Sequence, residues 1–198
     1  MRREPVAGGE GGHGQAEAAE RKTLALVLAI NVVLFVVELW AGWIAESMGL
    51  VADSLDMLAD ALVYGAAWWA VGAGQRRQAR VARVGGVIQL ALAGGVALEV
   101  ARRAYAGSAP VSLLMMAVSA LALLGNTVCL VLLHRHREGG LHMRASWIFT
   151  ASDVLANLGV MAAGLLVRVT GSAWPDLVVG LAVCALVVQG GVRILRAR

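Results

Sequence analysis

Charged residues are scarce in this chain of 198 residues, and aromatic residues are scarcer still. Asp, Glu, Lys and Arg make up only 15% of the sequence, against roughly 25% in an average soluble domain. The hydrophobic fraction reaches 59%, and the mean hydropathy is +0.73. This shortage of charge argues against an ordinary soluble enzyme and indicates a protein that lies mostly in lipid.

Cysteine is nearly absent as well, since Cys129 and Cys184 are the only two and both lie within apolar runs. Neither a disulfide framework nor a zinc knuckle is therefore expected. The net charge of +4 does not point to nucleic acid, because the basic residues lie in short segments between the apolar runs. Charge in those places orients membrane helices. We expect no nucleic-acid partner, no organic cofactor and no enzymatic activity.

The apolar residues fall into six long runs with short separators. A bilayer core about 30 Å thick is crossed by roughly 20 helical residues. A helix also satisfies its own backbone hydrogen bonds, which lipid cannot do. We therefore predict an all-α, polytopic membrane protein with six transmembrane helices, over residues 23–45, 48–73, 84–101, 112–133, 146–167 and 175–193.

The start of the chain differs from the rest in composition. Residues 1–20 are rich in Gly, Glu and Ala without apolar periodicity, so we predict a disordered cytoplasmic tail there and a membrane domain over residues 21–198. Lys and Arg number 14 on one side of the predicted spans and three on the other. This bias places both termini in the cytoplasm, and we expect a bacterial inner (plasma) membrane protein with no cleaved leader and no domain after the sixth helix.

Aspartates within the predicted spans are the strongest chemical signal. Each Asp at the middle of a bilayer costs about 2.5 to 3.5 kcal/mol, so its charge must be compensated. Asp53, Asp56 and Asp60 lie on one stripe of a helix, because a helix turns about 100° per residue. Asp153 and Asn157 share the spacing of four residues in the fifth run. Carboxylates that converge from two helices, without basic partners nearby in the sequence, predict a bound cation.

Other arrangements of intramembrane acids are known. These aspartates would also be tolerated in a watery vestibule, or protonated and hydrogen-bonded to Ser and Asn. An intramembrane aspartyl protease also places two Asp on neighbouring helices. The Tyr-Asp and Gly-x-Gly-Asp contexts that such a protease needs do not occur in this sequence.

Two motifs in the first third of the chain point to a known family. The segment VADSLDMLADAL contains an Asp-x-x-x-Asp motif, formed by Asp56 and Asp60, with Asp53 just before it. The preceding run has the spacing N-x-x-x-F-x-x-E-x-x-x-G, with a serine after it. Its members are Asn31, Phe35, Glu38, Gly42 and Ser47.

Later runs carry further matches. Asn126 lies in the fourth run, Asp153 and Asn157 lie within HMRASWIFTASDVLANLGV, and Asp176 lies within GSAWPDLVVG. Together these motifs resemble the cation diffusion facilitator family of divalent-metal/proton antiporters, over residues 22–198. The resemblance implies a homodimer that exports a divalent metal from the cytoplasm in exchange for protons.

The resemblance also implies the metal site. Its carboxylate ligands would be Asp56, Asp60 and Asp153, which would exchange the metal for protons. Metal and protons would compete for the same oxygens, because clustered carboxylates in a medium of low dielectric need a cation. The fourth ligand stays open among Asp53, Thr150, Ser152, Asn157 and water.

Four further residues are expected to line the cavity around the ion. Asn31 and Glu38 are seven positions apart and share one face of the first helix, where hydrogen bonding between helices is the alternative. Asn126 stands at the family's usual Asn position. Phe149, four residues before Asp153, stands where the family usually has His.

Phe149 leaves a set of oxygen ligands, which suits manganese, iron(II), magnesium or calcium better than a tetrahedral zinc site does. The Irving–Williams order nevertheless favours zinc over manganese, so zinc, manganese, iron, cobalt and cadmium stay open as substrates. Phe149 and the end of the chain after the sixth run also fit a non-transporting relative, such as a metal sensor or a subunit that depends on a partner. A passive channel is a third possibility.

Overall fold

The computed structural model describes residues 10–70, 75–134 and 141–196. These residues form six α-helices and no strand, which confirms the predicted all-α class. The helices are α1 (Glu10–Ile44), α2 (Met48–Ala70), α3 (Gln75–Ala106), α4 (Ser112–His134), α5 (Leu141–Thr170) and α6 (Trp174–Arg196).

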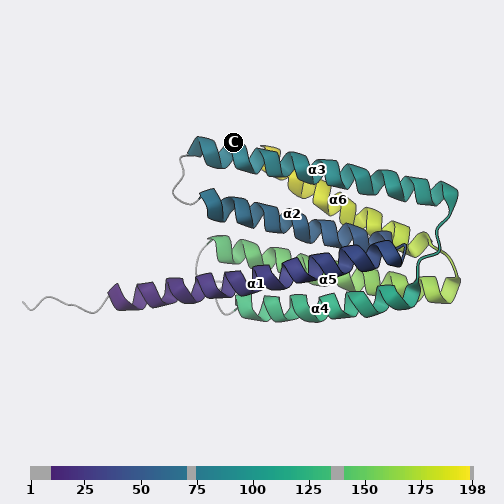
Figure 1. Cartoon of the computed structure of the whole chain (residues 1–198), viewed down its shortest axis with the longest axis horizontal. Helices are drawn as coiled ribbons and strands as arrows, with labels where there is room; N and C mark the ends of the chain where they lie inside the picture. Colours follow the sequence, from purple (N-terminus) through teal and green to yellow (C-terminus); the bar gives the residue numbers. More distant parts are fainter. Residues whose placement is uncertain (1–9, 71–74, 135–140, 197–198) are drawn as a thin grey trace, which may run out of the picture.

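The six helices lie side by side along the long axis of the molecule (Figure 1). α3 packs along α6 and α4 along α5, while α2 contacts α1, α3, α5 and α6. α1 begins and α6 ends at the same end of the bundle, which we call the proximal end. The opposite, distal end carries the connections 45–47, 107–111 and 171–173. α2 is therefore the helix with neighbours on most sides.

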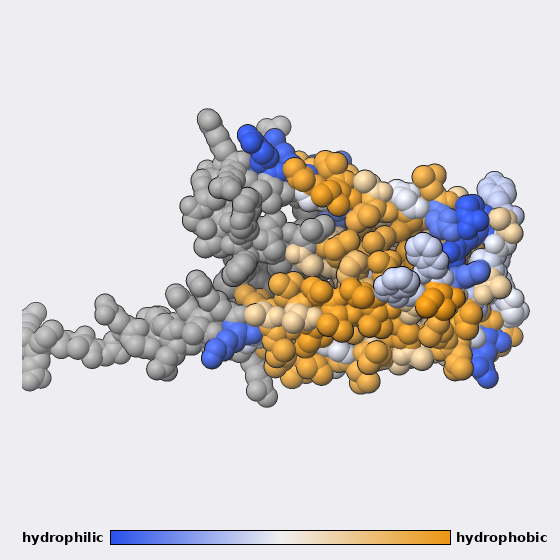
Figure 2. All heavy atoms as spheres, viewed as in Figure 1, coloured by the Kyte–Doolittle hydropathy of each residue, from blue (hydrophilic) through white to orange (hydrophobic). Residues whose placement is uncertain are grey.

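Much of the bundle's exterior is apolar. Figure 2 shows one face on which hydrophobic residues form a broad band, with hydrophilic residues toward its ends. Large hydrophobic side chains such as Trp40, Leu124 and Leu155 are exposed on the described helices. Within the described residues, five helices are long and apolar enough to cross a membrane. α2 is not one of the five; it carries three aspartates and lies among four other helices.

The predicted tail differs from the structure over residues 10–20, which belong to α1. The segment just before the first apolar run, from Gln15 to Lys22, consists almost entirely of Ala, Glu, Gln, Arg and Lys. These residue types favour helix, so the first membrane helix continues into the polar sequence. Residues 1–9 of the predicted tail lie outside the described residues.

Two other helices also extend past their apolar runs. α3 begins at Gln75, whereas the run begins at residue 84, and α5 covers 141–170 rather than 146–167. The added segments are rich in Arg and other residues that form helix well. The apolar run therefore marks where a helix can lie in lipid, and does not mark where the helix ends.

Each helix that ends at the distal end is followed by a residue in the left-handed region. Gly107 and Gly171 have φ values of 82° and 66°, and each donates its backbone N–H to the carbonyl four residues earlier at 2.9 Å. This is the geometry of a helix C-cap. Glu46 takes the same region after α1, with φ of 51°. These caps allow the chain to reverse direction within a few residues.

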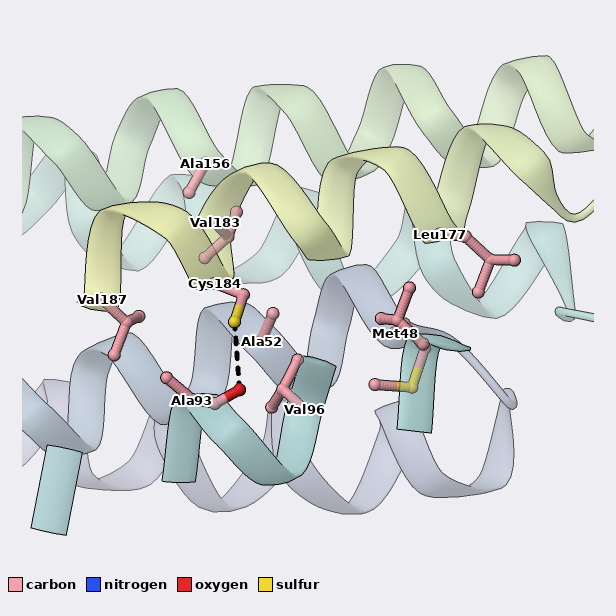
Figure 3. Close-up of a cluster of buried hydrophobic side chains, with 10 residues drawn as sticks. Met48, Ala52, Ala93, Val96, Ala156, Leu177, Val183, Cys184 and Val187 are labelled. Carbon is pink, nitrogen blue, oxygen red and sulfur yellow. Dashed lines mark hydrogen bonds between the residues drawn. The ribbon is translucent and has the colours of Figure 1, made fainter. Parts of the chain in front are cut away.

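Small residues let α6 pack closely on α2 and α3. Ala52 and Ala93 lie in a buried cluster with Val183 and Cys184 of α6 (Figure 3). The Cys184 thiol donates to the Ala93 carbonyl at 3.1 Å, which accounts for the buried cysteine without any metal or disulfide.

We predict that Gly171→Ala lowers the free energy of unfolding by about 1 to 2 kcal/mol, because an L side chain is disfavoured at positive φ. Gly94→Ala is the matched control, since it lies inside α3 and an added methyl group meets nothing within 4 Å. There alanine favours helix by up to about 1 kcal/mol. Thermal unfolding in detergent measures both. Equal shifts for the two variants would contradict the cap geometry.

Candidate metal site

α2 and α5 are antiparallel, and one close contact fixes their register. A Cβ atom added to Gly49, in the first turn of α2, would lie 3.3 Å from Val160 Cγ2 on α5. Both helices rise 1.5 Å per residue, so residues equally far from this contact lie at the same level. Asp56 lies seven positions after Gly49 on α2, and Asp153 lies seven positions before Val160 on α5. The two aspartates therefore lie at the same level.

The same register relates the neighbouring polar residues. Asp53 lies four positions after Gly49 and Asn157 lies three positions before Val160, so these two residues lie at nearly the same level. The backbone of Asp60 and that of Phe149 are each eleven positions from the contact and lie level with each other. On each helix these residues recur every three or four positions and therefore share one face. The predicted stripes of α2 and α5 thus run beside each other through the bundle.

Burial of the acids is pronounced. Asp53 and Asp153 are only 0% and 2% exposed, and Asp56 is half-buried. Both carboxylate oxygens of Asp53 and Oδ1 of Asp153 lack a hydrogen-bond partner among the described residues. The charges of Asp53, Asp56 and Asp153 are close enough to interact. Burying interacting negative charges without partners is costly, and a cation offsets that cost.

Glu38 adds a third helix to this polar region, and Asn126 of α4 is another buried polar residue. Glu38 of α1 is fully buried, and its charge interacts with those of Asp53 and Asp153. Neither of its oxygens has a described partner, and the same holds for both side-chain amide atoms of Asn126 on α4. Glu38 has no described hydrogen bond to another helix, and its role in lining the cavity around the ion stays a prediction.

Asn157 has one half of its amide occupied. Its Nδ2 donates to the Asp153 carbonyl of the same helix at 2.9 Å, whereas Oδ1 is buried without a described partner. This bond fixes the side chain, so the remaining free atom is an oxygen acceptor. An oxygen held in that way is suited to a cation.

Asn31 is engaged within its own helix. Its Nδ2 donates to the Val27 carbonyl at 2.9 Å, and the side chain is half-buried. No described hydrogen bond connects Asn31 to the acids of α2 and α5, so its role in lining a cavity stays a prediction. Phe149 is half-buried on α5, one turn before Asp153, and brings no nitrogen or oxygen donor to that level.

The described side chains do not complete the predicted ligand set. No three His, Cys, Asp or Glu side chains among them lie close enough to hold one metal ion. The side chain of Asp60 lies outside the described residues, although its backbone belongs to α2. The pair of Asp56 and Asp153 is therefore supported by position, and the full set stays a prediction.

Sequence reasoning missed how Asp53 and Glu38 come together. Each was noted on its own helix, but no periodicity relates positions on two helices. The available signal was that both are acids in apolar runs with no basic residue nearby in the sequence. An acid without a partner on one membrane helix predicts polar or charged residues on a neighbouring helix.

Comparison with known proteins identifies the fold. The family described as the cation efflux transmembrane domain matches residues 24–198. The chain belongs to the cation efflux family. The resemblance to the cation diffusion facilitators is confirmed. The chain, with its apolar helices, is an integral membrane protein.

Several bacterial members of the cation efflux family are similar to this chain. Zinc transporter ZitB of Yersinia pseudotuberculosis is 25% identical over 91% of the chain and 62% of the relative. Metal cation efflux system protein CzcD of Cupriavidus metallidurans is 26% identical over 78% of the chain and 53% of the relative. ZitB of Pectobacterium atrosepticum is 26% identical, with coverages of 93% and 62%. The chain thus spans at most 62% of the length of these relatives.

We predict that Asp53→Asn raises the free energy of unfolding of the metal-free protein by on the order of 1 kcal/mol. The change keeps the shape of the side chain and removes one of the interacting buried charges. Thermal unfolding in the presence of a chelator measures the effect. Glu99→Gln is the control, because Glu99 is paired with Arg102 and Arg103 at 2.6 and 2.8 Å near the surface. A larger loss of stability for Asp53→Asn than for Glu99→Gln would show that Asp53 is already compensated.

Proposed function

We propose that this chain exports a divalent metal cation from the cytoplasm by proton antiport, through the carboxylates of α2 and α5. The observation that carries the proposal is that Asp56 and Asp153 lie level on facing helices, in a region of buried oxygens without described partners. In lipid such oxygens need a cation, either a metal ion or protons. A transporter alternates between the two.

The proposed ligands are those that the sequence predicts. Asp56, Asp60 and Asp153 bind the metal ion, with Asp53 and Asn157 as further oxygen ligands. The same three aspartates exchange the metal for protons, as a coupled group in which one dication displaces the protons. Rocking of helices around the site then exposes it to each side of the membrane in turn.

The charge at the two ends supports a cytoplasmic location for both termini. Arg80, Arg83 and Arg193 lie in the parts of α3 and α6 near the proximal end. At the distal end Arg102 and Arg103 are paired with Glu99, which reduces the positive charge there. The positive-inside rule therefore favours a cytoplasmic proximal end. We propose a bacterial inner-membrane location and a homodimer, as the resemblance implies.

The substrate is proposed from the donor set. The relatives ZitB are named as zinc transporters and CzcD as a metal cation efflux protein. In this chain Phe149 supplies no imidazole at the level of Asp60, so the ligands are oxygens. Such a set binds zinc, manganese, iron, cobalt or cadmium with less preference for zinc than a site containing His.

A metal sensor or a subunit that depends on a partner is the second candidate. It is favoured by Phe149 and by the finding that no three described acids lie close enough to hold one ion. Such a protein would bind metal without moving protons, so flux separates the two functions.

We predict metal-dependent proton flux in liposomes that contain only this chain, measured with a pH-sensitive dye inside the vesicles. Asp56→Asn and Asp153→Asn are each expected to reduce the flux at least a hundredfold, because each removes a shared ligand and proton carrier. Glu99→Gln, outside the site, is expected to retain it. The absence of flux for the unaltered chain, with metal binding intact, would favour the sensor or subunit.

We predict that Phe149→His increases the preference for zinc over manganese by roughly tenfold, because an added imidazole nitrogen suits zinc better. The measurement is competition between Zn²⁺ and Mn²⁺ for uptake into the same vesicles. Phe149→Leu is the control, since it changes the size of the side chain without adding a donor. If both variants keep the original preference, position 149 does not face the ion.

A further inference from the structure

Asp176 at the start of α6 is fully buried and bound to another helix. Its carboxylate accepts hydrogen bonds from the Ser47 hydroxyl at 2.6 Å, from the Met48 N–H at 2.7 Å and from the Gly49 N–H at 2.9 Å. Met48 and Gly49 are the first two residues of α2. Asp176 therefore caps α2 from outside that helix, in addition to the cap that Ser47 provides.

Ser47 completes this arrangement. Its hydroxyl oxygen accepts the Leu50 N–H at 3.2 Å, which is the usual bond of an N-cap serine. The first three N–H groups of α2 are thus all bonded, although such groups have no partner within their own helix. The negative charge of Asp176 also lies at the positive end of the α2 dipole.

Close packing leaves little space for movement at this point. A Cβ atom added to Gly180, one turn after Asp176, would lie 2.8 Å from the Met48 carbonyl carbon. A Cβ atom added to Gly49 would lie 3.1 Å from Asp176 Oδ1 and 3.3 Å from Val160 of α5. The first turn of α2 is therefore held between α5 and α6. Figure 3 shows Met48 and Leu177, which belong to the buried cluster at this junction.

We propose that Asp176 is a positioning residue: it holds the first turn of α2 on α6, where Gly49 packs against Val160 of α5, and so keeps Asp56 level with Asp153. A slip of α2 by one residue moves it about 1.5 Å and turns its side chains by about 100°. Such a slip would break both backbone bonds to Asp176 and turn Asp56 away from α5. The hydrogen bonds from Met48 and Gly49 to Asp176 lie only two turns of α2 from Asp56, so they are close to the site.

The consequence for transport rests on the proposed function. Without the bonds to Asp176, α2 would occupy several axial positions relative to α5. The carboxylates of Asp56 and Asp153 would then be level with each other for a smaller fraction of the time. Metal affinity would fall more than stability alone explains. Asp176 does not have to contact the ion for this effect.

The test compares Asp176→Asn with Val183→Ala in the full chain. Asparagine keeps the size of the side chain but loses the charge and one of the two acceptor oxygens. Val183 lies in the buried cluster on α6, two turns from Asp176, so its truncation destabilises the same helix without removing a hydrogen bond to the first turn of α2. Thermal unfolding is measured first, to establish that the two variants have similar stability.

The first measurement is the distance between spin labels at Leu58 on α2 and Leu155 on α5, in a chain whose two cysteines are replaced by alanine. We expect Asp176→Asn to shift the mean distance or to broaden the distribution, because a slip by one residue moves the label on α2 by about 1.5 Å along the axis and turns it by about 100°. Val183→Ala is expected to leave it unchanged. An unchanged distribution in Asp176→Asn overturns the inference, whatever the transport result.

The second measurement is the KM for Zn²⁺ in the liposome flux assay. We expect Asp176→Asn to raise KM at least tenfold, while Val183→Ala changes it less than twofold. Equal KM values for the two variants overturn the proposed effect on the site. If Asp176→Asn does not fold, Ser47→Ala replaces it, with a smaller expected shift because the two backbone bonds remain. Absence of flux in the unaltered chain refutes the proposed transport function, and the distance measurement still decides the inference.

Discussion

Asp53 and Asp153 are buried between helices with oxygens that have no described hydrogen-bond partner. In lipid this burial is costly, because a buried negative charge without hydrogen-bond partners is unfavourable. The rest of the bundle limits that cost to one region. α2, which carries three acids, lies among four other helices, while the helices around it present apolar side chains outward.

Asp176 shows what a compensated carboxylate looks like in the same fold. It is as deeply buried as Asp53, yet its oxygens accept three hydrogen bonds from Ser47 and the first turn of α2. The contrast separates two uses of a buried acid. A carboxylate with all its bonds made holds helices together, whereas one without partners is available to a cation that comes and goes.

The sequence was sufficient to predict six helices and the stripe of acids on α2, because both follow from the helical period and from the cost of charge in lipid. The level of Asp56 against Asp153 was not predictable, since it depends on the contact between Gly49 and Val160 on different helices. The start of α1 was placed too late, because a helix of Ala and Glu continues without apolar residues. Asn31 bonds its own helix, a choice that spacing alone does not reveal.

A site made of oxygens that repel one another has a functional advantage for transport. Conduction needs a site that binds strongly enough to load the ion and weakly enough to release it. Mutual repulsion favours loading, and protons that arrive from the other side remove the same repulsion and so favour release. The exchange that we propose would require the carboxylates to stay level with each other, which would link the chemistry of the site to the register of α2. The bonds between Asp176 and the first turn of α2 would keep that register, because the acids of α2 lie farther along the same helix.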